Sequence, residues 1–354
     1  MAQNIVHLVS SLMVGGAEKF VCGLAKQQVI HGHSVTIISF GCSNDPFQLE
    51  LADSKVKIIN ICGSLFSRSL QLVQLRHFEI IHIHSPAVIK ALVPILPVLI
   101  SKKCFYTIHG EVDPPQSLLK LSHKLALVYL KRCSAVSEAA RKSVANRYGW
   151  KSQQIKVIPN GIEIPKTTLK NTQININNNL RLGIVSRFIP LKNIALLFNV
   201  LASLPEESLK RIELHLFGDG PLRYELEILA TGLPKLKKIF YGNVSDDKLI
   251  YPSFDVLVMC SDSEGLPMSI IEAMGYAKPV IATNVGAIPS LVIPEQTGWL
   301  YSPRDAQMLK EILNSCLLQP TLLLNYGQKA LYLVKQQYSI DAVAKQFMHL
   351  YLDN

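Results

Sequence analysis

Residues 255–283 constrain the fold more tightly than any other stretch of this 354-residue sequence. The runs 255–260 and 278–283 are apolar and have the length of buried strands. Between them, 261–275 begins with turn residues and continues with a helical pattern. The order strand, turn, helix, strand predicts a parallel α/β unit, because parallel strands need a crossover connection of this kind.

Two glutamates occupy this stretch eight positions apart. Glu264 falls in the turn after the first strand, and Glu272 falls on the helix. Ligands of open α/β sheets bind beyond the carboxyl ends of the strands, where Glu264 is expected. The start of the helix, around Met268 and Ser269, offers unpaired N–H groups and a positive dipole end, which suits phosphate. Carboxylates beside an anion site suggest a ligand with hydroxyls at both ends and phosphate in the middle, as in a nucleotide sugar. In the alternative interpretation, Glu264 complements the helix dipole and Glu272 lies on a solvated face.

Strand and helix patterns alternate along most of the chain. In the first half, strand patterns occupy 5–9, 34–40, 56–61, 80–84, 104–108, 134–136 and 155–158. The alternation restarts at 180–185, after the Asn-rich segment 166–179, which we interpret as an interdomain linker. We therefore expect two α/β domains with parallel sheets, over residues 1–165 and 180–339.

Composition favours a globular protein of the cytosol. Hydrophobic residues make up 49% of the chain and charged residues 18%. We expect no signal peptide, because residues 5–9 already have a strand pattern, and no membrane span, because Lys90 and two prolines interrupt the apolar region 86–100. The seven cysteines form no pair with metal-ligand spacing, so we interpret them as reduced, buried thiols.

Positive charge is concentrated in the first half of the chain. The net charge is +10, and residues 1–165 carry 18 Lys and Arg against 9 Asp and Glu. Lys120, Lys124, Lys131 and Arg132 flank apolar helical stretches, which suggests an amphipathic helix on an anionic membrane surface. The alternative is the solvated face of an ordinary helix that covers the sheet. No nucleic-acid-binding module is evident, so we do not expect nucleic acid as a partner.

The stretch around Glu264 and Glu272 resembles the signature of the retaining family 4 glycosyltransferases of GT-B fold. The shared features are the two glutamates, the following Ala-Met, and the strand Lys-Pro-Val-Ile-Ala-Thr at 278–283. Further motifs similar to those of the family occur in order along nearly the whole chain. The resemblance implies two Rossmann-like β/α/β domains facing a central cleft, with the C-terminal helix 340–354 packing back on the first domain.

The resemblance also implies a donor site in the second domain. Glu264 would contact the donor sugar and Glu272 the ribose, while the backbone near Val244 would meet the base. Arg187 and Lys192 match two cations that bind the diphosphate, together with the N–H groups of Met268 and Ser269. Three family glycines are replaced here, by Ser186, Asn193 and Pro267, and the proline has no N–H to offer.

The first domain would form the acceptor side. Gly15 and Gly16 resemble the family's acceptor loop, and a plain tight turn is the alternative. His109, in Thr-Ile-His-Gly, matches the family histidine beside the donor sugar and the bond that breaks. His82 and His84 lie on one face of a strand, but no third ligand is apparent, so we interpret them as structural or cleft-lining residues.

The function implied is retaining transfer of a hexose, with a UDP-sugar as the expected donor and without a metal ion or other cofactor. The acceptor would be a glycan or a lipid-linked sugar in the assembly of bacterial lipopolysaccharide, O-antigen or capsule. The protein would be cytoplasmic, or peripheral on the inner membrane. Three alternatives stay open: a non-catalytic GT-B scaffold or nucleotide-binding partner subunit, a metal-dependent transferase that uses Asp262 and Glu264, and a polyanion-binding protein.

Overall fold

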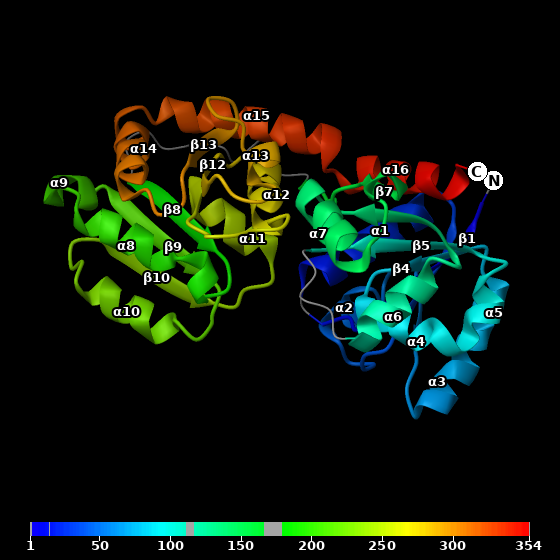
Figure 1. Ribbon diagram of the computed structural model, residues 1–354. Coiled ribbons are helices and arrows are strands. Elements are labelled where there is room, and N and C mark those ends of the chain that lie inside the picture. Colours follow the sequence, from blue (N-terminus) through cyan, green and yellow to red (C-terminus); the bar gives the residue numbers. More distant parts are fainter. Residues whose placement is uncertain (1, 14, 111–116, 166–178, 354) are drawn as a thin grey trace. The chain divides into compact units, whose positions relative to one another are not determined.

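The chain folds into two compact units in a computed structural model that describes residues 2–13, 15–110, 117–165 and 179–353 (Figure 1). The N-terminal unit consists of Met1–Glu163 and Tyr338–Asn354, and the C-terminal unit of Ile164–Gln337. Most of the predicted linker, 166–178, lies outside the described residues.

The N-terminal unit is built on a seven-stranded parallel sheet with the order β3-β2-β1-β4-β5-β6-β7. Its strands are β1 (Asn4–Val9), β2 (Ser34–Ser39), β3 (Lys57–Asn60), β4 (Ile80–Ile83), β5 (Lys103–Ile108), β6 (Leu130–Ala135) and β7 (Ile155–Val157). Its helices are α1 (Gly16–Ile30), α2 (Pro46–Glu50), α3 (Leu65–Leu72), α4 (Pro86–Leu92), α5 (Leu96–Leu99), α6 (Ser117–Ala126), α7 (Glu138–Tyr148) and α16 (Ile340–Leu352).

The C-terminal unit repeats this plan with a six-stranded parallel sheet of order β10-β9-β8-β11-β12-β13. Its strands are β8 (Leu180–Val185), β9 (Ile212–Phe217), β10 (Lys237–Gly242), β11 (Val256–Met259), β12 (Val280–Thr283) and β13 (Gly298–Tyr301). Its helices are α8 (Ile194–Ala202), α9 (Glu206–Leu209), α10 (Arg223–Thr231), α11 (Asp247–Ile250), α12 (Met268–Gly275), α13 (Ile288–Leu291), α14 (Ala306–Leu318) and α15 (Thr321–Gln337).

Both sheets have the Rossmann-like strand order, which confirms the predicted fold class. In each unit the order reverses beside the first strand, between β1 and β4 and again between β8 and β11. The loops that follow the two strands at such a reversal lead to opposite faces of the sheet. A crevice therefore forms between the carboxyl ends of these strands, and ligands of open α/β sheets bind there. The strand order therefore marks a candidate binding edge in each unit.

Helix α16 completes the core of the N-terminal unit although it lies at the far end of the sequence. It packs against α1, where His31 Nε2 and Asp341 Oδ1 are 2.8 Å apart. Phe347 and Tyr351 of α16 join Phe20 of α1 in the buried apolar cluster of this unit. Among the described residues, every helix falls short of the length and apolar content needed to cross a bilayer.

The structure does not contain the predicted amphipathic helix over all four basic residues. Helix α6 ends at Ala126, and Lys131 and Arg132 lie on the following strand, β6. Their side chains are exposed, as is that of Lys124 on α6. The side chain of Lys120 lies outside the described residues. The three described basic residues therefore come from two elements, because the apolar run after Ala126 turns into the strand instead of extending the helix.

Candidate active site

The polar residues of the C-terminal unit that the sequence singled out follow the two strands at the reversal. The loop after β8 carries Arg187 and Lys192, and the loop after β11 carries Glu264. Glu272 lies on α12, which follows that second loop. Val244 lies in the loop after β10, at the same edge of the sheet, but β10 is the outermost strand.

Glu264 is held by two partners. Its Oε1 accepts a hydrogen bond from Ser261 Oγ at 2.6 Å and lies 2.5 Å from Lys192 Nζ. The side chains of Lys192 and Glu264 are only 15% and 9% exposed. Because solvent screens a pair at this depth weakly, the two charges hold each other in place. The structure thus brings together the predicted sugar-binding carboxylate and one of the two predicted phosphate-binding cations.

A glycine that the sequence reasoning did not select fixes the backbone of Glu264. Gly286 has φ +55°, and a Cβ atom at this position would lie 1.7 Å from the carbonyl oxygen of Glu264. The amide of Ala287 also donates to the carbonyl of Gly265 at 3.1 Å. The loop after β12 therefore packs directly on the loop that carries Glu264, and this contact requires glycine.

Glu272 has a partner that the sequence pattern did not reveal. The Tyr251 hydroxyl donates to Glu272 Oε2 at 2.5 Å. Burial raises the pKa of Tyr251 well above its usual value, and the neighbouring carboxylate raises it further, so the phenol stays protonated and can donate. The N-cap of α12 is Pro267, which leaves the amides of Met268 and Ser269 at its start.

The loop after β8 contains Ser186 and Asn193, the two residues that replace family glycines there. Asn193 has φ +44°, in the left-handed region that asparagine enters more readily than most residues. Gly218 packs on the carbonyl of Ser186, where a Cβ atom would be only 1.9 Å from the oxygen. Arg187, between these two contacts, is exposed. Asparagine therefore serves at position 193 because it tolerates the backbone conformation there.

Asp262 and Glu264, the alternative metal-binding pair, each contact a cation. Arg304 Nη2 lies 2.9 Å from Asp262 Oδ2, and this hydrogen bond lowers the pKa of the carboxyl. Glu264 is paired with Lys192. Each carboxylate is thus neutralised by its own basic partner, which favours the structural interpretation of Asp262 over a role as a metal ligand.

The acceptor-side residues predicted in the N-terminal unit meet at one edge of its sheet. Gly15 is the N-cap of α1 and Gly16 is its first residue. His109 directly follows β5, and its ring centroid lies 5.7 Å from that of Phe20 on α1. Burial lowers the pKa of His109 to about 4, so the ring is neutral at physiological pH.

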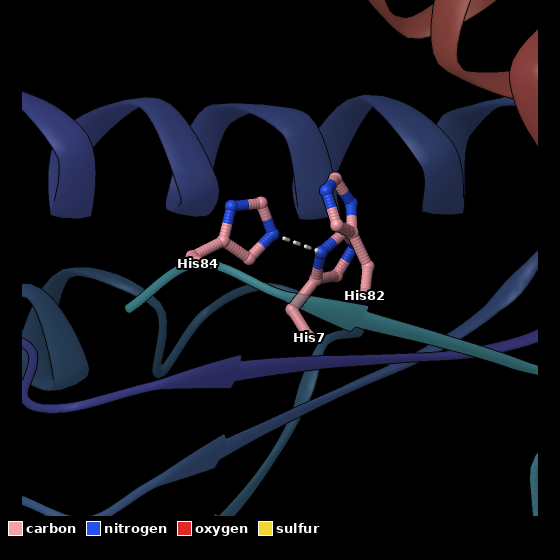
Figure 2. Close-up of side chains that lie close together, drawn as sticks. All are labelled: His7, His82 and His84. Carbon is pink, nitrogen blue, oxygen red and sulfur yellow. Dashed lines mark hydrogen bonds between the residues drawn. The ribbon is translucent and has the colours of Figure 1, made fainter. Parts of the chain in front are cut away.

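His82 and His84 do have a third histidine beside them, contrary to the expectation from the sequence. His7 of β1 joins them beneath α1, and one nitrogen of each ring lies within 4.8 Å of the others (Figure 2). The rings of His82 and His84 are 3.9 Å apart between centroids, on one face of the sheet. His7 was missed because it lies 75 positions before His82, and only the pairing of β1 with β4 brings it close.

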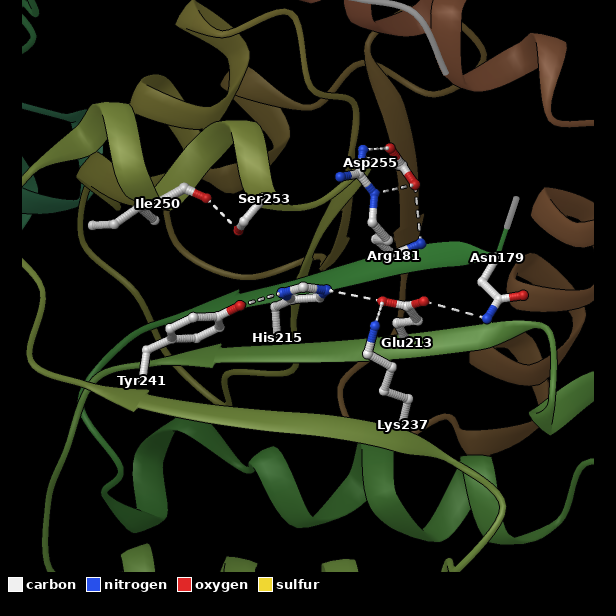
Figure 3. Close-up of polar contacts among 9 residues, drawn as sticks. All are labelled: Asn179, Arg181, Glu213, His215, Lys237, Tyr241, Ile250, Ser253 and Asp255. Atoms are coloured by element: carbon white, nitrogen blue, oxygen red, sulfur yellow. Dashed lines mark hydrogen bonds and ion pairs between the residues drawn. The ribbon is translucent and has the colours of Figure 1, made fainter. Parts of the chain in front are cut away.

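The opposite edge of the C-terminal sheet holds a separate polar cluster (Figure 3). Arg181 and Asp255 form two side-chain hydrogen bonds, of 2.6 and 3.2 Å, at the amino ends of β8 and β11. Lys237 pairs with Glu213 at 2.9 Å across β10 and β9. These groups tie together the starts of four strands, so we assign them to stability and not to the candidate site.

Both halves of the chain match known families of proteins. Residues 166–331 match the family described as Glycosyl transferases group 1, and residues 14–165 match Glycosyltransferase Family 4. Sulfoquinovosyl transferase SQD2 of Arabidopsis thaliana is 32% identical over 218 residues, 57% of this chain and 40% of that protein. Protein CapJ of Staphylococcus aureus is 26% identical over 60% of this chain and 54% of its own length. The chain thus spans about half the length of these relatives.

Other similar proteins match over nearly their full length. An uncharacterised 41.2 kDa protein from the cps region of Klebsiella pneumoniae is 24% identical, over 88% of this chain and 89% of that one. The crystal structure of Anabaena HepE with UDP has a TM-score of 0.81 at 22% identity, covering 98% of this chain and 99% of the other. The lipopolysaccharide outer core galactosyltransferase WaaB has a TM-score of 0.72 at 18% identity, over 98% of both chains. These structures share the two-domain fold.

Proposed function

Since this chain belongs to the family 4 glycosyltransferases of GT-B fold, we propose that it transfers a hexose from a nucleotide diphosphate sugar to a glycan or lipid-linked acceptor. The contact of Ser261 and Lys192 with Glu264 carries the proposal. It places a buried, charge-balanced carboxylate beyond the carboxyl end of β11, at the strand reversal where ligands bind. Glu272 follows eight residues later on α12.

In this proposal the C-terminal unit binds the donor. Glu264 contacts the sugar, Glu272 the ribose hydroxyls, and the backbone near Val244 the base. Arg187 and Lys192, with the amides of Met268 and Ser269, bind the diphosphate. Positive groups fixed in this way stabilise the negative charge that develops on the diphosphate as the sugar bond breaks.

The N-terminal unit would supply the acceptor side through Gly15, Gly16 and His109. We propose retention of anomeric configuration, with the departing phosphate accepting the proton of the acceptor hydroxyl. Fixed cations and amides would take the place of a metal ion, and EDTA should then leave turnover unchanged. A loss of turnover with EDTA that Mg²⁺ or Mn²⁺ restores would contradict this part.

A UDP-sugar is the proposed donor and bacterial surface polysaccharide the proposed pathway. The Anabaena neighbour was solved with UDP, with UDP-glucose, and with UDP and glucose. Several relatives carry names from polysaccharide assembly, among them the O-antigen glycosyltransferase WbnH of Escherichia coli. These names support the pathway.

The proposal is tested by thermal unfolding with UDP, GDP, ADP and dTDP. A nucleotide at about 100 times its dissociation constant stabilises the protein by roughly 2.7 kcal/mol. Glu272→Ala should lose most of that shift, whereas Glu225→Ala, a change on the exposed face of α10, should keep it. If no nucleotide stabilises the folded protein, the donor site is wrong. If a sugar nucleotide binds but no acceptor consumes it, the protein is a scaffold.

We also propose that an anionic membrane surface binds the N-terminal unit. Leu127 and Val128 are 46% and 63% exposed, and Lys124, Lys131 and Arg132 are exposed nearby in the sequence. Apolar side chains beside basic ones suit the boundary of an anionic bilayer. Replacing the three basic residues with Gln should abolish sedimentation with phosphatidylglycerol vesicles, and unchanged sedimentation would refute the proposal.

A further inference from the structure

A row of hydrogen-bonded side chains connects the interior of the N-terminal unit to His109. Gln28 Oε1 of α1 lies 2.7 Å from His7 Nε2, and His7 Nδ1 lies 2.9 Å from His84 Nε2 (Figure 2). His84 Nδ1 then lies 3.0 Å from His109 Nε2. Gln28 and His7 are fully buried, and His84 is 6% exposed. Two imidazole rings thus connect a buried amide to the histidine at the edge of the sheet.

Each of these rings carries a single N–H. Burial lowers the pKa of His7 and of His109 to about 4, and lowers that of His84 well below its usual value. A neutral imidazole has one donor nitrogen and one acceptor nitrogen. In a row of such rings, the donor nitrogen of one ring must face the acceptor nitrogen of the next. Once the position of the hydrogen is fixed in the ring at one end, the tautomer of every other ring follows.

The amide of Gln28 makes that choice. Its Oε1 can only accept, so His7 carries its hydrogen on Nε2 and accepts at Nδ1. Burial raises the pKa of Tyr351 and the Gln28 side chain lowers it, so the two side chains lie close together. The Gln28 amide faces His7 with its oxygen, and its nitrogen makes no hydrogen bond to a described residue in this orientation.

We propose that Gln28, His7 and His84 are positioning residues that fix the tautomer of His109, with the hydrogen on Nε2 and a lone pair on Nδ1. His84 Nε2 donates to His7, and His109 Nε2 donates to His84 Nδ1. The role in sugar transfer rests on the function proposed above, because only that function places His109 beside the donor sugar. The tautomer itself rests on the hydrogen bonds and on the Gln28 amide facing His7 with its oxygen.

The surroundings of His109 Nδ1 fit this assignment once the Asn160 amide is turned around. This nitrogen is buried and has no hydrogen-bond partner in the orientation given, and neither has Asn160 Oδ1. Asn160 contacts the His109 ring and, against the larger effect of burial, raises the pKa of His109 with its oxygen toward the ring. Half a turn of the Asn160 amide would place its N–H against the lone pair of Nδ1, and the hydrogen-bond network decides which way an amide faces. A buried acceptor with a donor beside it is the arrangement expected in folded proteins.

Metal binding by His7, His82 and His84 explains these contacts less well. Besides the nitrogens already described, His82 Nδ1 lies 2.5 Å from the Tyr351 hydroxyl and His82 Nε2 lies 2.7 Å from Thr107 Oγ1. All six ring nitrogens of the three histidines therefore have a hydrogen-bond partner. A cation could bind only after several of these buried bonds had broken.

The tautomer can be measured directly, without any substrate. The whole chain, with nitrogen-15-labelled histidine, would be studied by two-bond proton–nitrogen correlation at pH 7.5, and His109 identified by its loss in His109→Gln. We expect the pattern of a neutral ring with its hydrogen on Nε2. A hydrogen on Nδ1 would overturn the proposal.

Variants at Gln28 separate positioning from simple packing. Gln28→Leu fills similar space but removes the acceptor, so His109 should show a mixture of both tautomers. Gln28→Glu retains an oxygen acceptor and should keep the single tautomer. If Gln28→Leu fails to fold, His84→Phe breaks the same row closer to His109. An unchanged His109 pattern in either folded variant would refute the proposal.

His82→Phe is the matched control. His82 lies on the same strand two residues before His84 and is fully buried, but its nitrogens bond to Tyr351 and Thr107 instead. It should cost stability and leave the tautomer of His109 unchanged.

Turnover provides the second measurement. Gln28→Leu should lower kcat about 10-fold to 100-fold, the range found when a partner that orients a metal-binding histidine is removed. KM for the donor should change little, and Gln28→Glu should restore most of kcat. A defined tautomer with no transfer of sugar to any acceptor would contradict the proposed function and leave the hydrogen-bond assignment intact.

Discussion

Gly286→Ala tests whether the loop after β12 holds Glu264 in place. An alanine at φ +55° costs about 1–2 kcal/mol in backbone strain alone. Its Cβ would lie 1.7 Å from the Glu264 carbonyl oxygen, whereas real Cβ atoms essentially never come closer than 3.0 Å to another heavy atom. One of the two backbones must therefore move by more than 1 Å, and such overpacking adds about 1–3 kcal/mol.

Gly242→Ala is the control for the backbone strain of an alanine at positive φ. Gly242 lies in the same unit at φ +71°, and the nearest atom to its Cβ would be the Arg223 side chain at 3.5 Å. Both variants pay the backbone strain, and only Gly286→Ala meets a neighbouring backbone. Urea unfolding followed by circular dichroism should show Gly286→Ala to be the less stable variant by about 1–3 kcal/mol.

The same displacement should also reduce catalysis. Moving a reacting or sugar-binding group by about 1 Å can lower turnover about 100-fold. Gly286→Ala protein that remains folded at the assay temperature should therefore show a large fall in kcat. Equal stability of the two glycine variants would refute the packing argument, and full activity of Gly286→Ala would refute the link from this loop to Glu264.

Three further outcomes follow from single contacts. Tyr251→Phe should weaken UDP binding, measured by titration calorimetry, because Glu272 loses the hydroxyl that orients it; unchanged affinity would remove Tyr251 from the site. Burial lowers the pKa of Lys278 to about 8, so the unfolded chain binds more protons between pH 8 and 10.5 and stability should rise with pH there; Lys278→Met should raise the free energy of unfolding at pH 7 and flatten that rise. A thiol reagent should modify Cys42 and Cys62 quickly in the folded protein and the buried cysteines slowly; rapid reaction of more than two thiols would contradict the burial.

The elements of the fold were largely predictable because the buried strands of a parallel sheet are short apolar runs. Strand β1 and helix α16 lie within a residue or two of the ranges expected from the sequence. The order of the strands came only from the family resemblance, since nothing in a single apolar run states which other run pairs with it. That order decides which loops lie at the reversal, and so it turns a list of polar residues into a site.

The partners of the site residues were equally hidden. The sequence places Lys192 and Glu264 72 positions apart, and it predicted separate roles in binding phosphate and sugar, whereas their side chains contact each other. Tyr251 belongs to a short connection before β11 that has no recognisable motif. A glycine in a loop signals a special backbone conformation, so Gly286 was detectable as such, but its contact with Glu264 depends on tertiary packing.

The return of α16 to the N-terminal unit sets an order for biosynthesis. Residues 164–337 separate Glu163 from the segment that completes the unit's core, and synthesis at 5–20 residues per second needs about 10–35 s to cross that distance. Until Phe347 and Tyr351 have emerged from the ribosome, the apolar surface of α1 around Phe20 stays uncovered. The C-terminal unit, whose residues form one continuous segment, can fold during that interval. We therefore expect the second unit to mature first, and the first unit to depend on chaperones while it waits.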